Sequence, residues 1–114
     1  ADKRSVAEFL HSLKEVLGSG GRFFLVPREK NTRSLLRLGL SFRNCRQELL
    51  TLTELDYCSG PDADLAGKGD VWVFGKEIEG RSVYIKVKVT RGSPGAVTCI
   101  SFHEAEARLK YVYK

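Results

Sequence analysis

Strict alternation of apolar and polar residues over Ser82–Thr90 constrains the fold of this chain more than any other feature. Because side chains of a β-strand point alternately to the two faces of a sheet, the pattern predicts a strand with a valine- and isoleucine-rich face. Tyr84, Lys86 and Lys88 then lie on the other face, roughly 6.6–7 Å apart. A straight row of hydrogen-bond donors and positive charges of this kind suits a polyanion.

Two further stretches with a period of two flank this segment, at residues 70–78 and 97–105. A tight turn at 79–80 and a Gly/Pro-rich loop at 91–96 separate the three stretches, which therefore predict an antiparallel meander. Large aromatic residues in strands are mostly buried, so we expect Trp72 and Phe74 in the core.

Which face each side chain of the last strand points to depends on which of its residues enter the core. If Ile100 and Phe102 do so, the alternate residues emerge on the same face as Tyr84. These alternate residues are Cys99, Ser101 and His103.

The N-terminal half of the chain has helical spacing instead. Apolar residues three and four apart predict a helix over about 5–17, with Ser5 and Glu8 as its capping box and GSGG at 18–21 as its end. Residues 22–28 predict a short strand at a sheet edge or a strand end, because Pro27 has no N–H for a ladder.

Two shorter helices follow, over 29–38 and 42–50. Gly39 is expected to end the first and Ser41 to cap the second. The apolar side of the first helix is assigned to Leu35, Leu36 and Leu38.

The segment from Ser59 to Gly69, rich in Gly, Pro and Asp, predicts a polar loop that is long for a chain of 114 residues. A single compact domain over 1–114 is expected at this length. With helices first and strands last, the predicted class is α+β, in which N-terminal helices pack on one face of a C-terminal antiparallel β-sheet. The other face is then left open.

Composition favours an acidic partner, because 19 Lys and Arg against 14 Asp and Glu give a formal net charge of +5. Three cysteines without CxxC spacing predict reduced thiols in a cytoplasmic protein. No signal peptide or long apolar run is found, so no membrane association is expected. Walker A, GxGxxG and HExxH motifs are absent as well, and neither a metal nor a cofactor is expected.

A face lined by Tyr84, Lys86, Ser101 and His103 offers the groups needed for metal-free cleavage of RNA. In that reaction a base takes the 2′-OH proton, cations stabilise the charged phosphorane, and an acid protonates the leaving 5′ oxygen. Glu104 follows His103, and its carboxylate is expected to hold the imidazole. A merely solvated strand face is the alternative interpretation of the alternating lysines.

Four segments follow one another along the chain: LGLSFRNC (38–45), LLTLTELDY (49–57), VYIKVKV (83–89) and CISFHEAE (99–106). Their order and spacing resemble the MqsR-type toxins of bacterial toxin–antitoxin pairs, a branch of the RelE-like ribonuclease fold. The resemblance spans about residues 35–106. It implies a metal-independent mRNA endonuclease that inhibits translation, with Tyr84 and His103 in the active site and Lys86 in the same segment.

The resemblance also implies a cognate antitoxin that combines a zinc-binding module with a helix-turn-helix module. The toxin would reach DNA only indirectly, through this antitoxin. Two positions depart from the family pattern. Ser59 lies in the region where the family has a lysine, and Val73 stands where it has a glutamine. Histidine in place of lysine at position 103 is a competent general acid.

The predicted catalytic residues are therefore Tyr84, Lys86 and His103. Further RNA contacts are predicted at Lys88, Lys76, Arg91 and Lys68. Two alternatives stay open: a non-catalytic RNA- or ribosome-binding module that uses the same basic face, and a protein-interaction domain whose sheet edge pairs with a partner strand.

Overall fold

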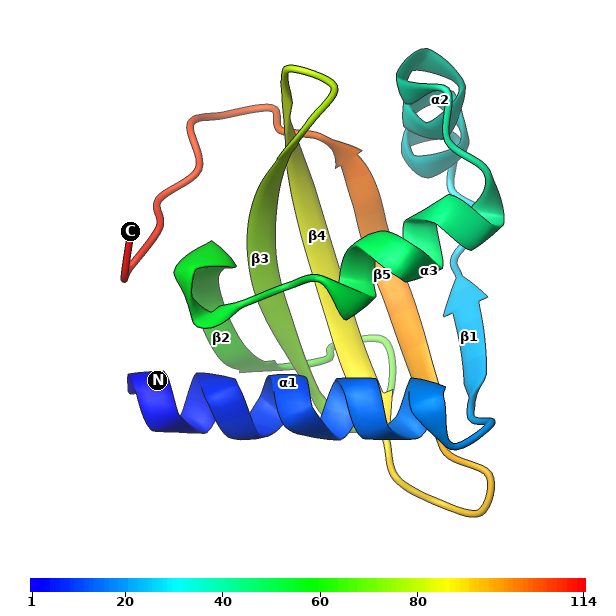
Figure 1. The fold of residues 1–114 in the computed structure, drawn as a ribbon, viewed down its shortest axis with the longest axis vertical. Helices are drawn as coiled ribbons and strands as arrows, with labels where there is room; N and C mark the ends of the chain where they lie inside the picture. The colour runs from blue at the N-terminus through cyan, green and yellow to red at the C-terminus, as the bar shows by residue number, and fades with distance from the viewer.

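The computed structural model describes all 114 residues, as three α-helices and a five-stranded sheet (Figure 1). The helical elements are α1 (Lys3–Gly18), α2 (Glu29–Leu38), α3 (Phe42–Leu50) and the 3-10 turn η1 (Glu54–Asp56). The strands are β1 (Arg22–Leu25), β2 (Tyr57–Ala63), β3 (Asp70–Ile78), β4 (Arg81–Thr90) and β5 (Ala96–Glu104). None of the helices has the length and apolar character needed to cross a bilayer.

The strand order is β1-β5-β4-β3-β2, and all neighbours are antiparallel except β1, which pairs parallel to β5. The helices precede most of the strands, so the predicted α+β class is confirmed. The predicted meander forms the centre of the sheet as β3, β4 and β5. The short strand before Pro27 lies at an edge, where the missing N–H of proline costs no ladder bond.

The hydrophobic core lies between the helices and one face of the sheet, which α1 and α3 cross in Figure 1. The apolar residues of β4 point into it, as the alternation predicts; Val83, Ile85 and Val87 are fully buried. Trp72 and Phe74 of β3 are buried too, as predicted. We call the opposite face, which carries Tyr84 and Lys86, the polar face.

The polar face is not left fully open, in contrast to the prediction. The C-terminal segment, residues 105–114, crosses it from the end of β5 towards β2 (Figure 1). The backbone N–H of Ala105 donates to Ser82, and that of Val112 donates to the carbonyl of Tyr57 at 3.1 Å. The segment has no periodicity of a regular element long enough to predict this course.

Helix α1 begins earlier than predicted. Its N-cap is Asp2, whose carboxylate accepts a hydrogen bond from the N–H of Ser5 at 2.8 Å. The predicted capping box of Ser5 and Glu8 is therefore wrong, since Ser5 already lies inside the first turn. A charged acceptor is favoured at this position because it satisfies a free N–H and faces the positive end of the helix dipole.

The ends of α2 and α3 follow the sequence prediction more closely. Gly39 ends α2 in the left-handed conformation, with φ 69°, and Ser41 caps α3 through a reciprocal pair of bonds with Asn44. Leu38 is buried, but Leu36 is 84% exposed, so its assignment to the apolar side of α2 is wrong. The helix lies beside the edge of the sheet (Figure 1), and Leu38 is its only buried apolar residue.

The predicted loop over Ser59–Gly69 is shorter than expected, because Tyr57–Ala63 pairs with β3 as strand β2. The pairing contains two register shifts, and such bulges remove the alternation from which a strand is predicted. At Gly60, φ is 107° and an added Cβ would lie 2.7 Å from the carbonyl oxygen of Val71. Only glycine fits there.

A bulge also interrupts the pairing of β4 with β5. Lys86 pairs with Ser101, whereas Val87 pairs with Cys99, so Ile100 has no partner residue. An extra residue moves all positions before it to the opposite face. Cys99 is consequently buried in the core, and the prediction that Ile100 enters the core beside Phe102 is wrong.

Asn31 in the first turn of α2 satisfies the backbone groups around this bulge. Its side chain is fully buried, and Nδ2 donates to the carbonyls of Val26 at 2.9 Å and Ile100 at 3.0 Å. Its Oδ1 accepts from the N–H of Phe102 at 2.9 Å. One side chain therefore fixes the start of α2 against the bulged part of β5.

We predict that Asn31→Leu lowers the free energy of unfolding by about 2–4 kcal/mol, because three backbone groups lose their bonds to a fully buried side chain. Urea denaturation measures this difference. Asn44→Ala is the matched control, since it removes only an exposed cap and should cost at most about 1 kcal/mol. Equal losses for the two variants would contradict the role given to Asn31.

Candidate functional site

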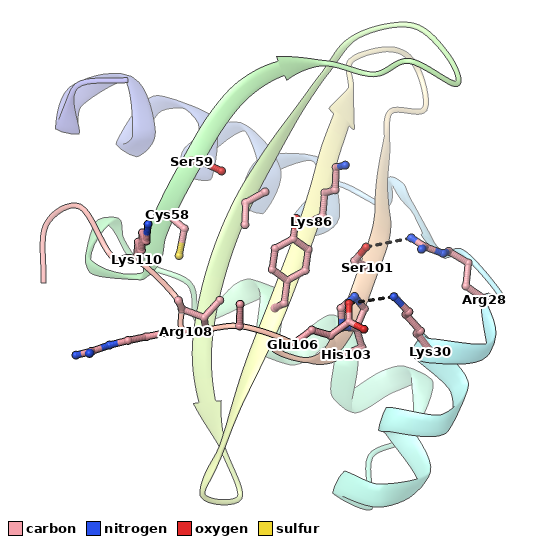
Figure 2. A pocket seen from close by; sticks show the side chains of 14 residues that line it. Arg28, Lys30, Cys58, Ser59, Lys86, Ser101, His103, Glu106, Arg108 and Lys110 are labelled. Atoms are coloured by element: carbon pink, nitrogen blue, oxygen red, sulfur yellow. Dashed lines mark hydrogen bonds and ion pairs between the residues drawn. The ribbon is translucent and has the colours of Figure 1, made fainter.

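A cavity of about 620 Å³ lies on the polar face of the sheet (Figure 2). Four strands form its floor, with Cys58, Ser59, Val73, Tyr84, Lys86, Ser101 and His103. Arg28 and Lys30, at the start of α2, line one side, and residues 106–110 of the C-terminal segment run from Glu106 beside Lys30 to Lys110 beside Cys58 on the other side. The cavity is therefore built by parts of the chain that are far apart in sequence.

Strand register brings the three predicted catalytic residues together in this floor. Tyr84 of β4 is paired with His103 of β5, and Lys86 is paired with Ser101. The rings of Tyr84 and His103 stack, with centroids 5.3 Å apart and planes inclined by 20°. An imidazole, a phenol and an ammonium group thus border one space.

The imidazole of His103 is held by the backbone. Its Nδ1 lies 2.8 Å from the carbonyl oxygen of Glu104. A carbonyl only accepts hydrogen bonds, so Nδ1 carries a hydrogen and donates it, and Nε2 is the ring nitrogen without a hydrogen-bond partner in the protein. His103 is 7% exposed, so its ring is largely buried in the cavity floor.

The carboxylate of Glu104 does not hold this imidazole, and that prediction is wrong. Consecutive residues of a strand point to opposite faces, and Glu104 instead pairs with Arg81 at 3.1 Å and Arg37 at 3.6 Å. Only its backbone carbonyl contacts His103.

Tyr84 is positioned as a hydrogen-bond donor. Burial raises the pKa of its phenol, Cys58 nearby raises it further, and the guanidinium of Arg28 acts in the opposite direction. The hydroxyl therefore stays protonated at neutral pH.

Positive charge dominates the cavity lining. Five lining side chains are cationic: Arg28, Lys30, Lys86, Arg108 and Lys110. Glu106 is the only acidic residue among the lining residues, and its ion pair with Lys30 at 3.0 Å lowers the pKa of its carboxyl. The guanidinium of Arg28 donates to the hydroxyl of Ser101 at 3.2 Å. This balance favours an anionic ligand.

Lys88 and Lys68, which were predicted as RNA contacts, lie outside the cavity lining. The ammonium of Lys88 pairs with Asp64 at 2.5 Å and donates to the carbonyl of Lys68 at 3.2 Å. Lys88 thus closes the 64–69 loop onto the sheet, and its charge is balanced.

Lys76 and Arg91 lie away from the cavity as well. In β3, Lys76 is paired with the core residue Val83 and therefore points to the helix side, where it bonds Glu48 at 2.9 Å. Arg91 reaches α1 and pairs with Glu15 at 2.7 Å. Neither cation lines the space around Tyr84 and His103.

Sequence reasoning missed both sides of the cavity. The C-terminal side has only a short signal, because basic residues alternate with an apolar or aromatic residue over 108–111 and Val112 then interrupts the pattern. Arg28 and Lys30 carry no comparable pattern, because they reach the cavity only through the position of α2 beside β5. Ser59 of β2 was noted only as a departure from the family pattern, and it contributes a hydroxyl to the floor.

Comparison of the chain with protein-family models, with curated proteins and with solved structures found no match. The resemblance to MqsR-type toxins therefore depends on the four sequence segments. No group of three or more His, Cys, Asp or Glu side chains is arranged to hold a metal ion.

We predict that stability falls at high pH partly through Tyr84. The folded protein holds the phenolic proton more tightly than the unfolded chain, so this contribution is complete below pH ~10 and is lost as pH rises towards the raised pKa of Tyr84. Urea denaturation from about pH 9 to about pH 11 should show a smaller decline for Tyr84→Phe, which cannot titrate. Parallel declines for the two proteins would contradict the buried phenol.

Proposed function

We propose that this protein is an endoribonuclease that cleaves mRNA without a metal ion and acts as the toxin of a toxin–antitoxin pair. The observation that carries the proposal is the stacked pair of Tyr84 and His103 beside Lys86, inside a cavity of net positive charge. Cleavage by the RNA 2′-OH needs a proton donor for the leaving oxygen and groups that stabilise the charged phosphorane, for which this pair and this cation are suited.

In the proposed reaction, the 2′ oxygen of RNA attacks the adjacent phosphorus while the bond from phosphorus to the 5′ oxygen breaks. The 2′-OH proton passes to water, and Nε2 of His103 gives its proton to the leaving 5′ oxygen. Lys86 and Arg28 stabilise the extra negative charge of the phosphorane, and the Tyr84 hydroxyl donates a hydrogen bond to it. The products are a 2′,3′-cyclic phosphate and a 5′-OH.

We predict that purified protein cleaves mixed-sequence RNA in EDTA and that His103→Ala lowers the single-turnover rate about 10²–10⁴-fold, the contribution of one acid–base group. His11→Ala is the matched control. His11 lies on the exposed side of α1, next to Glu15, and its loss should leave the rate unchanged. Activity that vanishes in EDTA, or that survives His103→Ala, would refute the assignment.

The role of His103 as an acid can be separated from a role as a base. RNA with sulfur in place of the 5′ oxygen has a leaving group that hardly needs a proton. We predict that His103→Ala cleaves this substrate nearly as fast as the wild type does. A variant that is equally slow on both substrates would place His103 at the 2′-OH instead.

The toxin role predicts that expression of the protein in bacteria arrests growth and that Tyr84→Phe or Lys86→Ala relieves the arrest without loss of fold. Growth curves, with circular dichroism of the purified variants, measure both. Co-expression of a cognate antitoxin, with the zinc-binding and helix-turn-helix modules described above, should restore growth. Arrest without mRNA cleavage would favour the non-catalytic RNA- or ribosome-binding module.

A further inference from the structure

The C-terminal segment is fixed across the sheet without forming a strand. The hydrogen bonds of Ala105 and Val112 tie it to β4 and β2, and between them it passes over Gly75 of β3. A Cβ at Gly75 would lie 2.5 Å from Cδ1 of Leu109 and 2.8 Å from the hydroxyl oxygen of Tyr111. Glycine therefore allows this segment to pack directly on the sheet.

Side chains of the segment alternate between the sheet and solvent. Leu109, Tyr111 and Tyr113 are partly buried, whereas Arg108, Lys110 and Lys114 are exposed. The segment thus presents three positive charges to solvent, with the exposed Val112 between the last two, and the first two, on Arg108 and Lys110, also line the cavity.

These charges differ from most other cations near the sheet in having no carboxylate partner. Lys76, Lys88 and Arg91 each form an ion pair with an acidic residue. Arg108 and Lys110 form none, so they keep their full attraction for an external anion. Proteins that bind single-stranded nucleic acid combine such a basic path with partly exposed aromatic rings.

We propose that residues 108–114 form a track for single-stranded RNA that leads the strand into the cavity, with Arg108 and Lys110 as its phosphate contacts. This inference rests on the proposed function and adds the strandedness of the substrate. The floor of the cavity lies between α2 and the C-terminal segment. A single strand can turn its bases towards this floor, whereas the bases of a duplex stay stacked within the duplex and cannot reach it.

The test measures binding to RNA of ~12 nucleotides, single-stranded or duplex, in the His103→Ala background and at several salt concentrations. Affinity falls with salt, and the line of log affinity against log salt should become less steep by about 0.7 for Arg108→Gln and for Lys110→Gln, the value for one lost phosphate contact. The matched control is Arg43→Gln, an exposed arginine on α3 that should leave the slope unchanged. We expect the single strand to bind more tightly than the duplex.

The track would be overturned if the salt dependence of binding were the same for Arg108→Gln, Lys110→Gln and the His103→Ala parent, even if the wild type cleaves RNA. Equal affinity for single strand and duplex would overturn the proposed strandedness. If the slopes fall as expected but the wild type cleaves nothing, the track stands and the proposed catalysis fails. The two proposals are therefore tested separately.

Discussion

Pairing of β4 with β5 across one unpaired residue, Ile100, decides which side chains reach the cavity. Before the bulge, the core residue Cys99 shares a face with Val87; after it, Ser101 and His103 share the polar face with Lys86 and Tyr84. Without the extra residue, the strand would present its other set of side chains over half its length. The buried amide of Asn31 satisfies the backbone groups that the bulge leaves, and it couples α2 to the same strand.

The balance of charges distinguishes the cavity from the rest of the protein surface, which is basic as a whole. A net charge of +5 alone does not locate a binding site. Ion pairs balance several of the lysines and arginines outside the cavity, such as Lys88 with Asp64. Around the cavity, five cationic side chains face one acidic residue. The excess is concentrated where Tyr84 and His103 stack, which is the reason that the proposed chemistry is assigned to this face.

Local patterns predicted the parts of the fold that depend on neighbouring residues, such as the two faces of β4 and the cap at Ser41. They also placed Tyr84, Lys86 and His103 on one face. The pairing of β2 was missed because its bulges hide the alternation. Lys76 was predicted as an RNA contact, although alternation from the core residues Trp72 and Phe74 already places it on the helix side of β3. The sides of the cavity depend on how α2 and the C-terminal segment pack, which no short motif encodes.

The chain offers a direct measurement of the central claim, because it has two histidines: His103 in the cavity and His11 on the exposed side of α1. Imidazole signals of both can be followed by nuclear magnetic resonance during titration with a 2′-O-methylated RNA strand that cannot be cleaved. We predict that the signals of His103 shift and saturate, that its Nδ1 stays protonated, and that the signals of His11 do not move. Saturating shifts at His11 with no change at His103 would contradict the account.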